Sequence, residues 1–131
     1  MNHSPLISCL CLSSNDFSFL NRSIECFREQ TYPNKELVLV YNEKSPAIKE
    51  IKDIRPSGNI LKVEVNSKRN LLLGDLRNLA VEKSRGEFFC IWDDDDWHSA
   101  HRLKIQMDAL QTNNKEASIL TRLILYDKIR K

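Results

Sequence analysis

Apolar residues along the chain follow two patterns that alternate from one end to the other. Short runs of strand length are apolar at every position or at every second position, and each is followed by a segment whose apolar residues recur at steps of three and four. The first pattern is typical of β-strands and the second of one helix face. We expect strands at residues 6–12, 37–41, 61–65 and 88–92. We expect helices at residues 17–27, 47–54, 72–80 and 100–111.

Capping and helix-breaking residues mark where the predicted helices begin and end. Side-chain oxygens at residues 13–16 (SSND) can cap the first helix, and Ser99 can cap the last one. Pro33 follows the first helix and Gly86 follows the third, as expected of residues that end helices. The predicted strands and helices are therefore separate elements joined by short loops.

The order of these elements predicts an α/β fold. Strand and helix alternate four times at intervals of about 25 to 30 residues, which describes successive right-handed βαβ units. Lys62 and Glu64 give the strand at 61–65 one polar face, so it should lie at a sheet edge, whereas the strand at 88–92 (FFCIW) should be buried on both faces. We predict a Rossmann-like parallel sheet in the order 3-2-1-4, with helices on both faces, in a single domain over residues 1–131.

This strand order predicts where a ligand would bind. Open α/β sheets bind ligands beyond the carboxyl ends of their strands, at the point where the strand order reverses. The reversal falls between the first and fourth strands, which are followed by SSN at 13–15 and by four aspartates at 93–96. We therefore expect these two loops to meet at one end of the sheet.

Residues 117–126 are compatible with a fifth strand. Without neighbours, that strand would expose an apolar edge or patch. Its apolar residues are Ile119, Leu120, Leu123, Ile124 and Leu125. We therefore expect the chain to associate with itself, as a homo-oligomer, or with a partner chain.

Charge and hydropathy exclude several classes of function. Twenty Lys and Arg against 18 Asp and Glu give a net charge of +2, too small a bias for a nucleic-acid partner. No apolar run approaches the roughly 18 residues needed to cross a bilayer, so we expect no transmembrane segment. The N-terminus MNHSP lacks the basic start of a signal peptide, so we expect a soluble, cytoplasmic protein.

The cysteines match no spacing that is typical of a metal site. They are Cys9, Cys11, Cys26 and Cys90, and three of them lie in strands predicted to be buried. Cys9 and Cys11 would share one strand face, with no nearby His or Cys to complete a site. We therefore expect the cysteines to pack as small apolar residues.

Four adjacent carboxylates, Asp93 to Asp96, follow the most hydrophobic predicted strand. Like charges this close repel one another, and a nearby cation would relieve that repulsion. Oxygen ligands suit hard cations such as Mg²⁺ or Mn²⁺, which in such sites also bind substrate phosphates. A calcium loop is excluded because the sixth and twelfth positions from Asp93 are His98 and Lys104 instead of Gly and Glu. A metal–diphosphate site and a solvated acidic turn before a helix both stay open.

Three segments, in order along the chain, resemble motifs of family 2 glycosyltransferases of the GT-A fold. EQTYPNKELVLVYN (29–42) resembles that family's approach to its second strand, and GDLRNLAVEKSRGEF (74–88) resembles its Gly, Arg-Asn and Gly-Glu segment. GEFFCIWDDDDWHSAHRLKIQ (86–106) resembles its metal-binding segment, in which a D-x-D pattern follows a strand. The resemblance implies a nucleotide-sugar donor, a divalent cation (Mn²⁺ or Mg²⁺), and inverting transfer of the sugar to a glycan or another hydroxyl acceptor.

The resemblance also implies roles for residues at the expected ligand end of the sheet. Asp95 matches the last acid of the D-x-D pair and would bind the metal, with Asp93 as a second candidate ligand. Asp93 and Asp94 would contact the ribose or metal-bound water. Ser13 and Asn15 match the loop that packs on the nucleotide.

Two further positions are implied as contacts of the donor. Arg77 matches the motif arginine and would steady the diphosphate, unless it is an ordinary surface arginine, and Lys68 and Arg69 are weaker candidates. The family usually has an Asp-Asp pair after its second strand, where this chain has Tyr41-Asn42. Asn42 can still bond a base, since its amide is both donor and acceptor.

The catalytic base is unknown at this point. Inverting transfer needs a base to take the proton of the acceptor hydroxyl, and the family supplies it from a second half beyond the D-x-D motif. This chain continues for about 35 residues after its motif, and neither Glu116 nor Asp127 lies in a recognisable base motif. We expect Trp97 and His98 to pack against or hydrogen-bond the turn. We expect this chain to correspond to the nucleotide-sugar-binding half of the family domain.

Two alternative functions remain. One is a module that binds a nucleotide sugar without transferring it. The other is a metal-dependent nucleotidyltransferase, which is disfavoured because SSND after the first strand is no Gly-rich phosphate loop.

Overall fold

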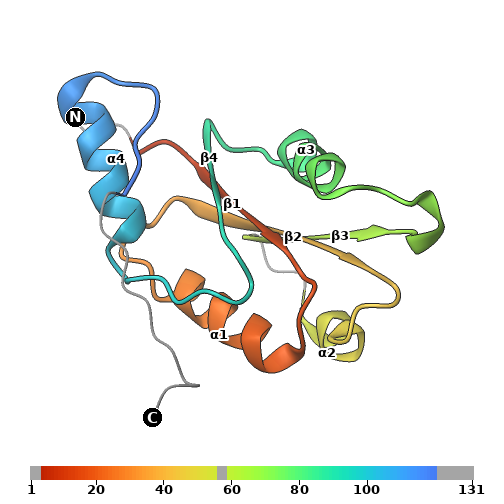
Figure 1. Ribbon diagram of the computed structural model, residues 1–131. Coiled ribbons are helices and arrows are strands. Elements are labelled where there is room, and N and C mark those ends of the chain that lie inside the picture. Colours follow the sequence, from red (N-terminus) through yellow and green to blue (C-terminus); the bar gives the residue numbers. More distant parts are fainter. Residues whose placement is uncertain (1–3, 56–58, 121–131) are drawn as a thin grey trace, which may run out of the picture.

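A four-stranded parallel sheet forms the centre of the protein (Figure 1). The computed structural model describes residues 4–55 and 59–120. The strand order is β3-β2-β1-β4, and each neighbouring pair is parallel, which confirms the predicted order. The strands are β1 (Ile7–Leu12), β2 (Lys35–Asn42), β3 (Ile60–Val65) and β4 (Phe88–Ile91). The chain therefore has the Rossmann-like α/β fold expected from its sequence.

Helices cover both faces of this sheet (Figure 1). Residues of α1, α2 and α4 pack into one core, and residues of α3 pack into a second. The helices are α1 (Phe17–Arg28), α2 (Ile48–Asp53), α3 (Leu73–Lys83) and α4 (Arg102–Asn113), with a 3₁₀ turn, η1 (Ser67–Arg69), after β3. Across the residues that the structure describes, no helix has the length and apolar character needed to cross a membrane.

Alternate residues of the central strands enter the two cores. Cys9 of β1 and Leu39 of β2 belong to the core with α1, α2 and α4, whereas Leu10 and Val40 belong to the core with α3. Successive side chains of a strand point to opposite faces, so a strand covered on both faces is apolar at every position. The runs LISCLCL and LVLVY follow from this arrangement. The cysteines are free and buried or half-buried, which confirms their predicted packing role.

β3 lies at the sheet edge that its polar residues predicted. One of these residues does more than face water. Nζ of Lys62 donates to the carbonyl oxygens of Ile51 and Ile54, at 3.3 and 2.8 Å, where α2 ends. A cation is favourable at the C-terminus of a helix, so Lys62 joins the edge strand to α2.

The prediction that residues 88–92 are buried on both faces is wrong. Among the described strands β4 pairs with β1 alone, and the side chain of Phe89 is 55% exposed. Trp92, which is fully buried, lies just beyond the strand. The hydrophobicity of this run predicts a strand covered on both faces, but part of the run belongs to an edge strand and part to the following loop.

Two predicted features on the C-terminal side also differ. α4 begins at Arg102, because Ser99 holds an extra turn ahead of it, in which its Oγ accepts the N–H of His101 at 3.3 Å. Residues 117–120 form no strand, and residues 121–126 of the predicted fifth strand lie outside the described residues. Ile119 and Leu120 are exposed.

A buried carboxylate joins the amino ends of β1, β2 and β4. Glu36 is 1% exposed and accepts hydrogen bonds from Ser8 Oγ (2.6 Å), Arg85 N (2.7 Å) and Arg85 Nε (2.9 Å). Burial raises the pKa of Glu36, but these bonds outweigh it and lower the pKa overall. Gly86 N–H donates to Ser8 Oγ at 2.9 Å, and a Cβ on Gly86 would lie 2.5 Å from the same oxygen. The chain therefore needs glycine where it enters β4.

Candidate functional site

The buried carboxylate of Asp94 joins the loops after β1 and β4. Its Oδ2 accepts the backbone N–H groups of Ser14 and Asn15, at 2.9 and 3.0 Å, and its Oδ1 accepts the side-chain amide of Asn15 at 3.0 Å. Asp94 is only 4% exposed, so these bonds are shielded from water. The sheet order reverses between β1 and β4, and the two loops therefore meet where the sequence predicted a ligand site.

Hydrogen bonds connect the loops after the other two strands to the same surface. Ser13 is buried, and its Oγ lies 3.5 Å from Oγ of Ser45 in the loop after β2. Glu43, in that loop, accepts the backbone N–H and the hydroxyl of Ser67 in η1, after β3. The carboxyl ends of all four strands thus carry loops that hold one another in place.

The three other acids of the turn are exposed, while α1 holds their backbone. They are Asp93, Asp95 and Asp96. Oγ of Ser23 donates to the carbonyl oxygen of Asp93 at 3.1 Å, and Arg22 donates to the carbonyl oxygen of Asp95 at 3.4 Å. The carboxylates therefore extend into solvent from a main chain that α1 holds at Asp93 and at Asp95.

The electrostatics of the acid turn favour a cation. Burial, followed by the charge of Asp96 and a hydrogen bond with it, raises the pKa of Asp93, while Arg77 opposes this rise. Two carboxylates this close are stabilised by positive charge, and their oxygens are the ligands that Mg²⁺ and Mn²⁺ prefer. Within residues 4–55 and 59–120, no three His, Cys, Asp or Glu side chains form a metal site by themselves. A cation would thus need water and ligand oxygens as well, which is common for Mg²⁺.

Aromatic stacking holds the two ends of the acid turn together. The rings of Trp92 and His98 stack, with centroids 3.8 Å apart and an interplanar angle of 28°. The buried indole of Trp92 donates to the carbonyl oxygen of Ser23 at 3.0 Å. Arg102 lies 5.1 Å from the centroid of the indole, and its NH1 lies 3.0 Å from Nδ1 of His98. Burial, followed by the charge of Arg102, lowers the pKa of His98 to about 4, so the ring is neutral at pH 7 and accepts from Arg102.

The sequence only partly predicted this cluster. His98 packs and bonds at the turn as expected, but the same expectation is wrong for Trp97, which is 68% exposed. The parts played by Trp92, Ser23 and Arg102 were missed. Trp92 and His98 bracket the acids in the sequence, but that spacing alone does not predict stacking.

The remaining candidates lie at the end of β2 and on η1 and α3, which follow β3. Asn42 is the last residue of β2, and its Oδ1 accepts the N–H of Lys44 at 2.8 Å. Arg77 is exposed on α3, near enough to the acid turn to affect the pKa of Asp93. Lys68 and Arg69 are exposed in η1. The structure therefore places Arg77 near the acids, whereas Asn42 bonds within the turn that follows β2.

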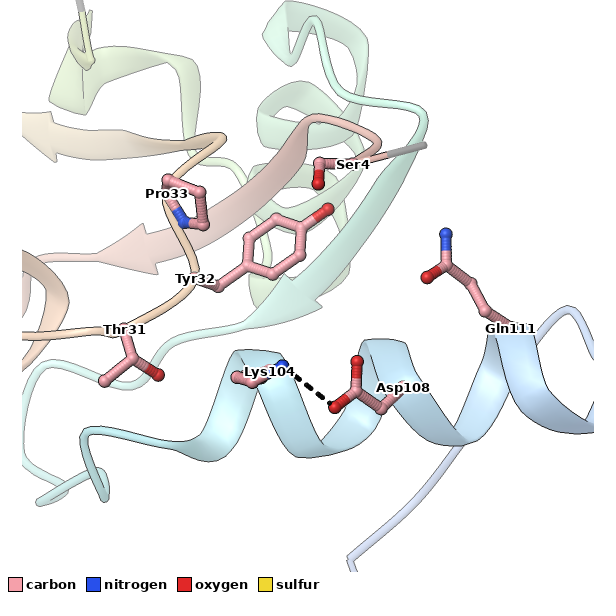
Figure 2. A pocket seen from close by; sticks show the side chains of 7 residues that line it. All are labelled: Ser4, Thr31, Tyr32, Pro33, Lys104, Asp108 and Gln111. Atoms are coloured by element: carbon pink, nitrogen blue, oxygen red, sulfur yellow. Dashed lines mark hydrogen bonds and ion pairs between the residues drawn. The ribbon is translucent and has the colours of Figure 1, made fainter. Parts of the chain in front are cut away.

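Two cavities lie elsewhere on the molecule. One, of about 210 Å³, lies between the turn before β2 and α4, where Figure 2 shows the Tyr32 hydroxyl pointing toward Ser4 and the ion pair of Lys104 and Asp108 on α4. The other, of about 710 Å³, runs along β4 and α4. Neither is lined by residues 13–15 or 93–96. The candidate site is therefore separate from both of these cavities.

Comparison with known proteins identifies relatives of the chain. The family model described as Glycosyl transferase family 2 matches residues 11–130. EpsH of Bacillus subtilis, named as a glycosyltransferase, is 32% identical over 95 residues, which cover 72% of this chain and 27% of EpsH. The uncharacterized glycosyltransferase MJ1057 of Methanocaldococcus jannaschii is 30% identical over 121 residues, which cover 88% of this chain and 40% of that protein.

Solved structures share the fold. S. aureus TarS in complex with UDP has a TM-score of 0.70 at 18% identity, over 95% of this chain and 39% of that one. The mannosyltransferase PcManGT from Pyrobaculum calidifontis, in complex with GDP-Man and Mn²⁺, has a TM-score of 0.60 at 22% identity, over 78% of this chain and 32% of that one. The chain thus spans 27% to 40% of the length of these two related proteins and two crystallised chains. It belongs to glycosyl transferase family 2 and has the GT-A fold.

Proposed function

We propose that the chain is the donor-binding part of a glycosyltransferase that moves a sugar from a nucleoside diphosphate to a hydroxyl acceptor. The observation that carries this proposal is the hydrogen-bonded contact between the loops after β1 and β4. Asp93 and Asp95 are exposed beside this contact. Open α/β sheets bind ligands at this place. The relatives support it, since TarS was solved with UDP and with UDP-GlcNAc, and PcManGT with GDP-Man and Mn²⁺.

Asp93 and Asp95 are the proposed ligands of Mn²⁺ or Mg²⁺. Their main-chain carbonyls are held by Ser23 and Arg22, so both carboxylates start from fixed positions. The raised pKa of Asp93 is support for a cation, because positive charge would relieve its repulsion from Asp96. When bound, the cation would supply positive charge that stabilises a nucleoside-diphosphate leaving group.

The proposed nucleotide surface is formed by Ser13, Asn15 and Asn42. Asn42 uses its amide oxygen to bond Lys44, so its amide nitrogen is the group that can donate to a base without breaking that turn. Asp94 serves this surface by holding Asn15 and is not itself exposed. Arg77 is placed to bind the diphosphate, because a guanidinium matches phosphate oxygens in charge and geometry.

In the proposed reaction the acceptor hydroxyl oxygen attacks the anomeric carbon as the bond to the diphosphate oxygen breaks, and the configuration inverts. A general base must take the hydroxyl proton. At this end of the described sheet, Asp93 and Asp95 are assigned to the cation, Asp96 is hydrogen-bonded to Asp93, and Asp94 is bonded to Asn15. We therefore assign the base to a segment outside the described residues or to a second chain.

A module that binds a nucleotide sugar without transferring it is the second candidate. It is favoured because no base is assigned among the described residues, where the acids at the site already have roles in binding or in loop structure. Release of nucleoside diphosphate from a nucleotide sugar in the presence of Mn²⁺, measured on the chain alone and with added acceptor sugars, tests the transferase. Release supports a transferase, whereas binding without release is expected of the module and also of a donor-binding part whose base lies on a second chain.

Thermal unfolding with a panel of nucleoside diphosphates, with and without Mn²⁺, tests the binding proposal. A ligand at about 100 times its dissociation constant adds about 2.7 kcal/mol of stability, which raises the melting temperature by several degrees. We expect one nucleotide to give a metal-dependent shift that Asp95→Ala abolishes. Asp53→Ala, at an exposed acid of α2, is the matched control and should keep the shift. No shift with any nucleotide would contradict the proposal.

A further inference from the structure

Two free cysteines lie opposite each other on the paired strands β1 and β4, outside the proposed donor site. Cys9 and Cys90 are register partners, and their Sγ atoms lie 3.7 Å apart. Neighbouring strands lie about 4.8 Å apart, within the Cα separations of about 4.4–6.8 Å that disulfides span. The two sulfurs can therefore be joined without moving the strands to a new register.

The two thiols differ in their access to solvent. Cys9 is fully buried, whereas Cys90 is half-buried and lines the cavity of about 710 Å³ along β4 and α4. Arg102 lines the same cavity. A small oxidant can thus reach Cys90 from the cavity, with Cys9 placed directly behind it.

The surroundings favour a thiolate at Cys90 over one at Cys9. A hydrogen bond with Cys9 lowers the pKa of Cys90, burial opposes this, and the charge of Arg102 lowers it further. Burial raises the pKa of the Cys9 thiol. The thiolate is the nucleophilic form of cysteine, so Cys90 should react first and Cys9 should keep its proton.

We propose that Cys9 and Cys90 form a redox modification site, at which a hydroperoxide oxidises Cys90 and Cys9 resolves the product to a disulfide. In the first step the Cys90 thiolate attacks the terminal peroxide oxygen. The O–O bond breaks, Cys90 becomes a sulfenic acid, and the departing alkoxide or hydroxide takes a proton from water. In the second step the Cys9 sulfur attacks the Cys90 sulfur, the S–O bond breaks, and hydroxide leaves with the Cys9 proton as water. The two sulfurs lose two electrons, which the peroxide gains.

This modification would act on the strands that carry the joined loops. Each cysteine lies four residues before a member of those loops, Ser13 after Cys9 and Asp94 after Cys90. Disulfide formation would shorten the sulfur separation from 3.7 Å to about 2.05 Å and tie β1 to β4 covalently. The inference concerns the thiols alone and holds whether or not the chain binds a nucleotide.

Peptide mapping of the folded chain after treatment with hydrogen peroxide tests the proposal. Remaining thiols are alkylated, and the digest is analysed by mass spectrometry without reduction. We expect a peptide pair linked through Cys9 and Cys90, which a dithiol reductant separates. With Cys9→Ser, we expect dimedone to trap a sulfenic acid at Cys90, because the resolving thiol is gone.

Cys11→Ala is the matched control. Cys11 is buried on the same face of β1 as Cys9, but β4 places no cysteine opposite it. The Cys9–Cys90 link should form in this variant as in the wild type. Failure of Cys90 to oxidise in the folded wild type would overturn the proposal, as would a sulfenic acid at Cys90 that persists with Cys9 present. Both readouts use wild-type protein, so they do not depend on the folding of any variant.

Discussion

Asn15 donates its backbone N–H and its side-chain amide to the two carboxylate oxygens of Asp94, each at 3.0 Å. This two-point contact joins the loops after β1 and β4 and is shielded from water. It gives one of the four adjacent acids a structural task, while Asp93 and Asp95 stay exposed. The acid turn is therefore divided between holding the site together and presenting charge to a ligand.

Asp94→Asn should destabilise the protein more than Asp96→Asn. The change keeps the shape of the side chain. It replaces one of the two oxygens that accept the N–H groups of the loop with an amide nitrogen, which is a donor. Hydrogen bonds to charged groups contribute about 1.5–3 kcal/mol each, so we expect a loss of about 2 kcal/mol or more in the free energy of unfolding.

Urea unfolding measures both variants. Asp96 is exposed, and its replacement should change the free energy of unfolding by less than about 0.5 kcal/mol. Equal losses in the two variants would show that Asp94 does not hold the loops.

Gly86→Ala should lower the melting temperature, and Gly74→Ala should not. A Cβ on Gly86 would lie 2.5 Å from Ser8 Oγ and 2.8 Å from the carbonyl oxygens of Leu6 and Phe88, whereas nothing lies within 4 Å of one on Gly74. Overpacking costs about 1–3 kcal/mol, while alanine in a helix is favoured over glycine by up to about 1 kcal/mol. Thermal unfolding of both variants checks this pair. A Gly86→Ala protein as stable as the wild type would contradict the close contact with Ser8.

His98 should make the protein less stable as the pH falls from 6.5 toward 4. Burial, and then Arg102, lowers the pKa of this histidine from 6.5 to about 4 in the folded state. Between these values the unfolded chain binds a proton that the folded chain does not, so acid favours unfolding. Above pH 6.5 this effect is absent.

His98→Phe keeps a ring against Trp92 and removes the titration. Its free energy of unfolding, measured in urea across this pH range, should depend less on pH than that of the wild type. His101→Gln removes an exposed histidine of the same segment and should keep the wild-type dependence. An unchanged pH dependence in His98→Phe is the result that would refute the role of this ring.

The sheet and the meeting of its loops could be predicted because they depend on local patterns. Cys9 and Leu10 point to different cores, so both are apolar, and Lys62 marks the edge strand by its charge. Once the order 3-2-1-4 is inferred, the loops that contain Asn15 and Asp94 must lie at the same end of the sheet.

Other parts depend on contacts between distant residues, which no local pattern records. The bonds of Asp94 to Asn15 join positions 79 residues apart, and Trp92 bonds Ser23 across 69 residues. Phe89 is a related case. Its hydrophobicity predicted a covered face, but that face lacks a cover among the described residues.

Paramagnetic broadening by Mn²⁺ in the NMR spectrum tests most directly whether a metal and nucleotide bind where the loops meet. The ¹⁵N-labelled chain is titrated with Mn²⁺ together with the nucleoside diphosphate that gives the largest thermal shift, and Mg²⁺ serves as the diamagnetic reference. We predict that the amide signals of residues 13–15 and 93–96 broaden first, and that Asp95→Ala removes the effect. Broadening centred on the β4–α4 cavity near Phe89 and Gln106, or none at all, would contradict the proposed donor site.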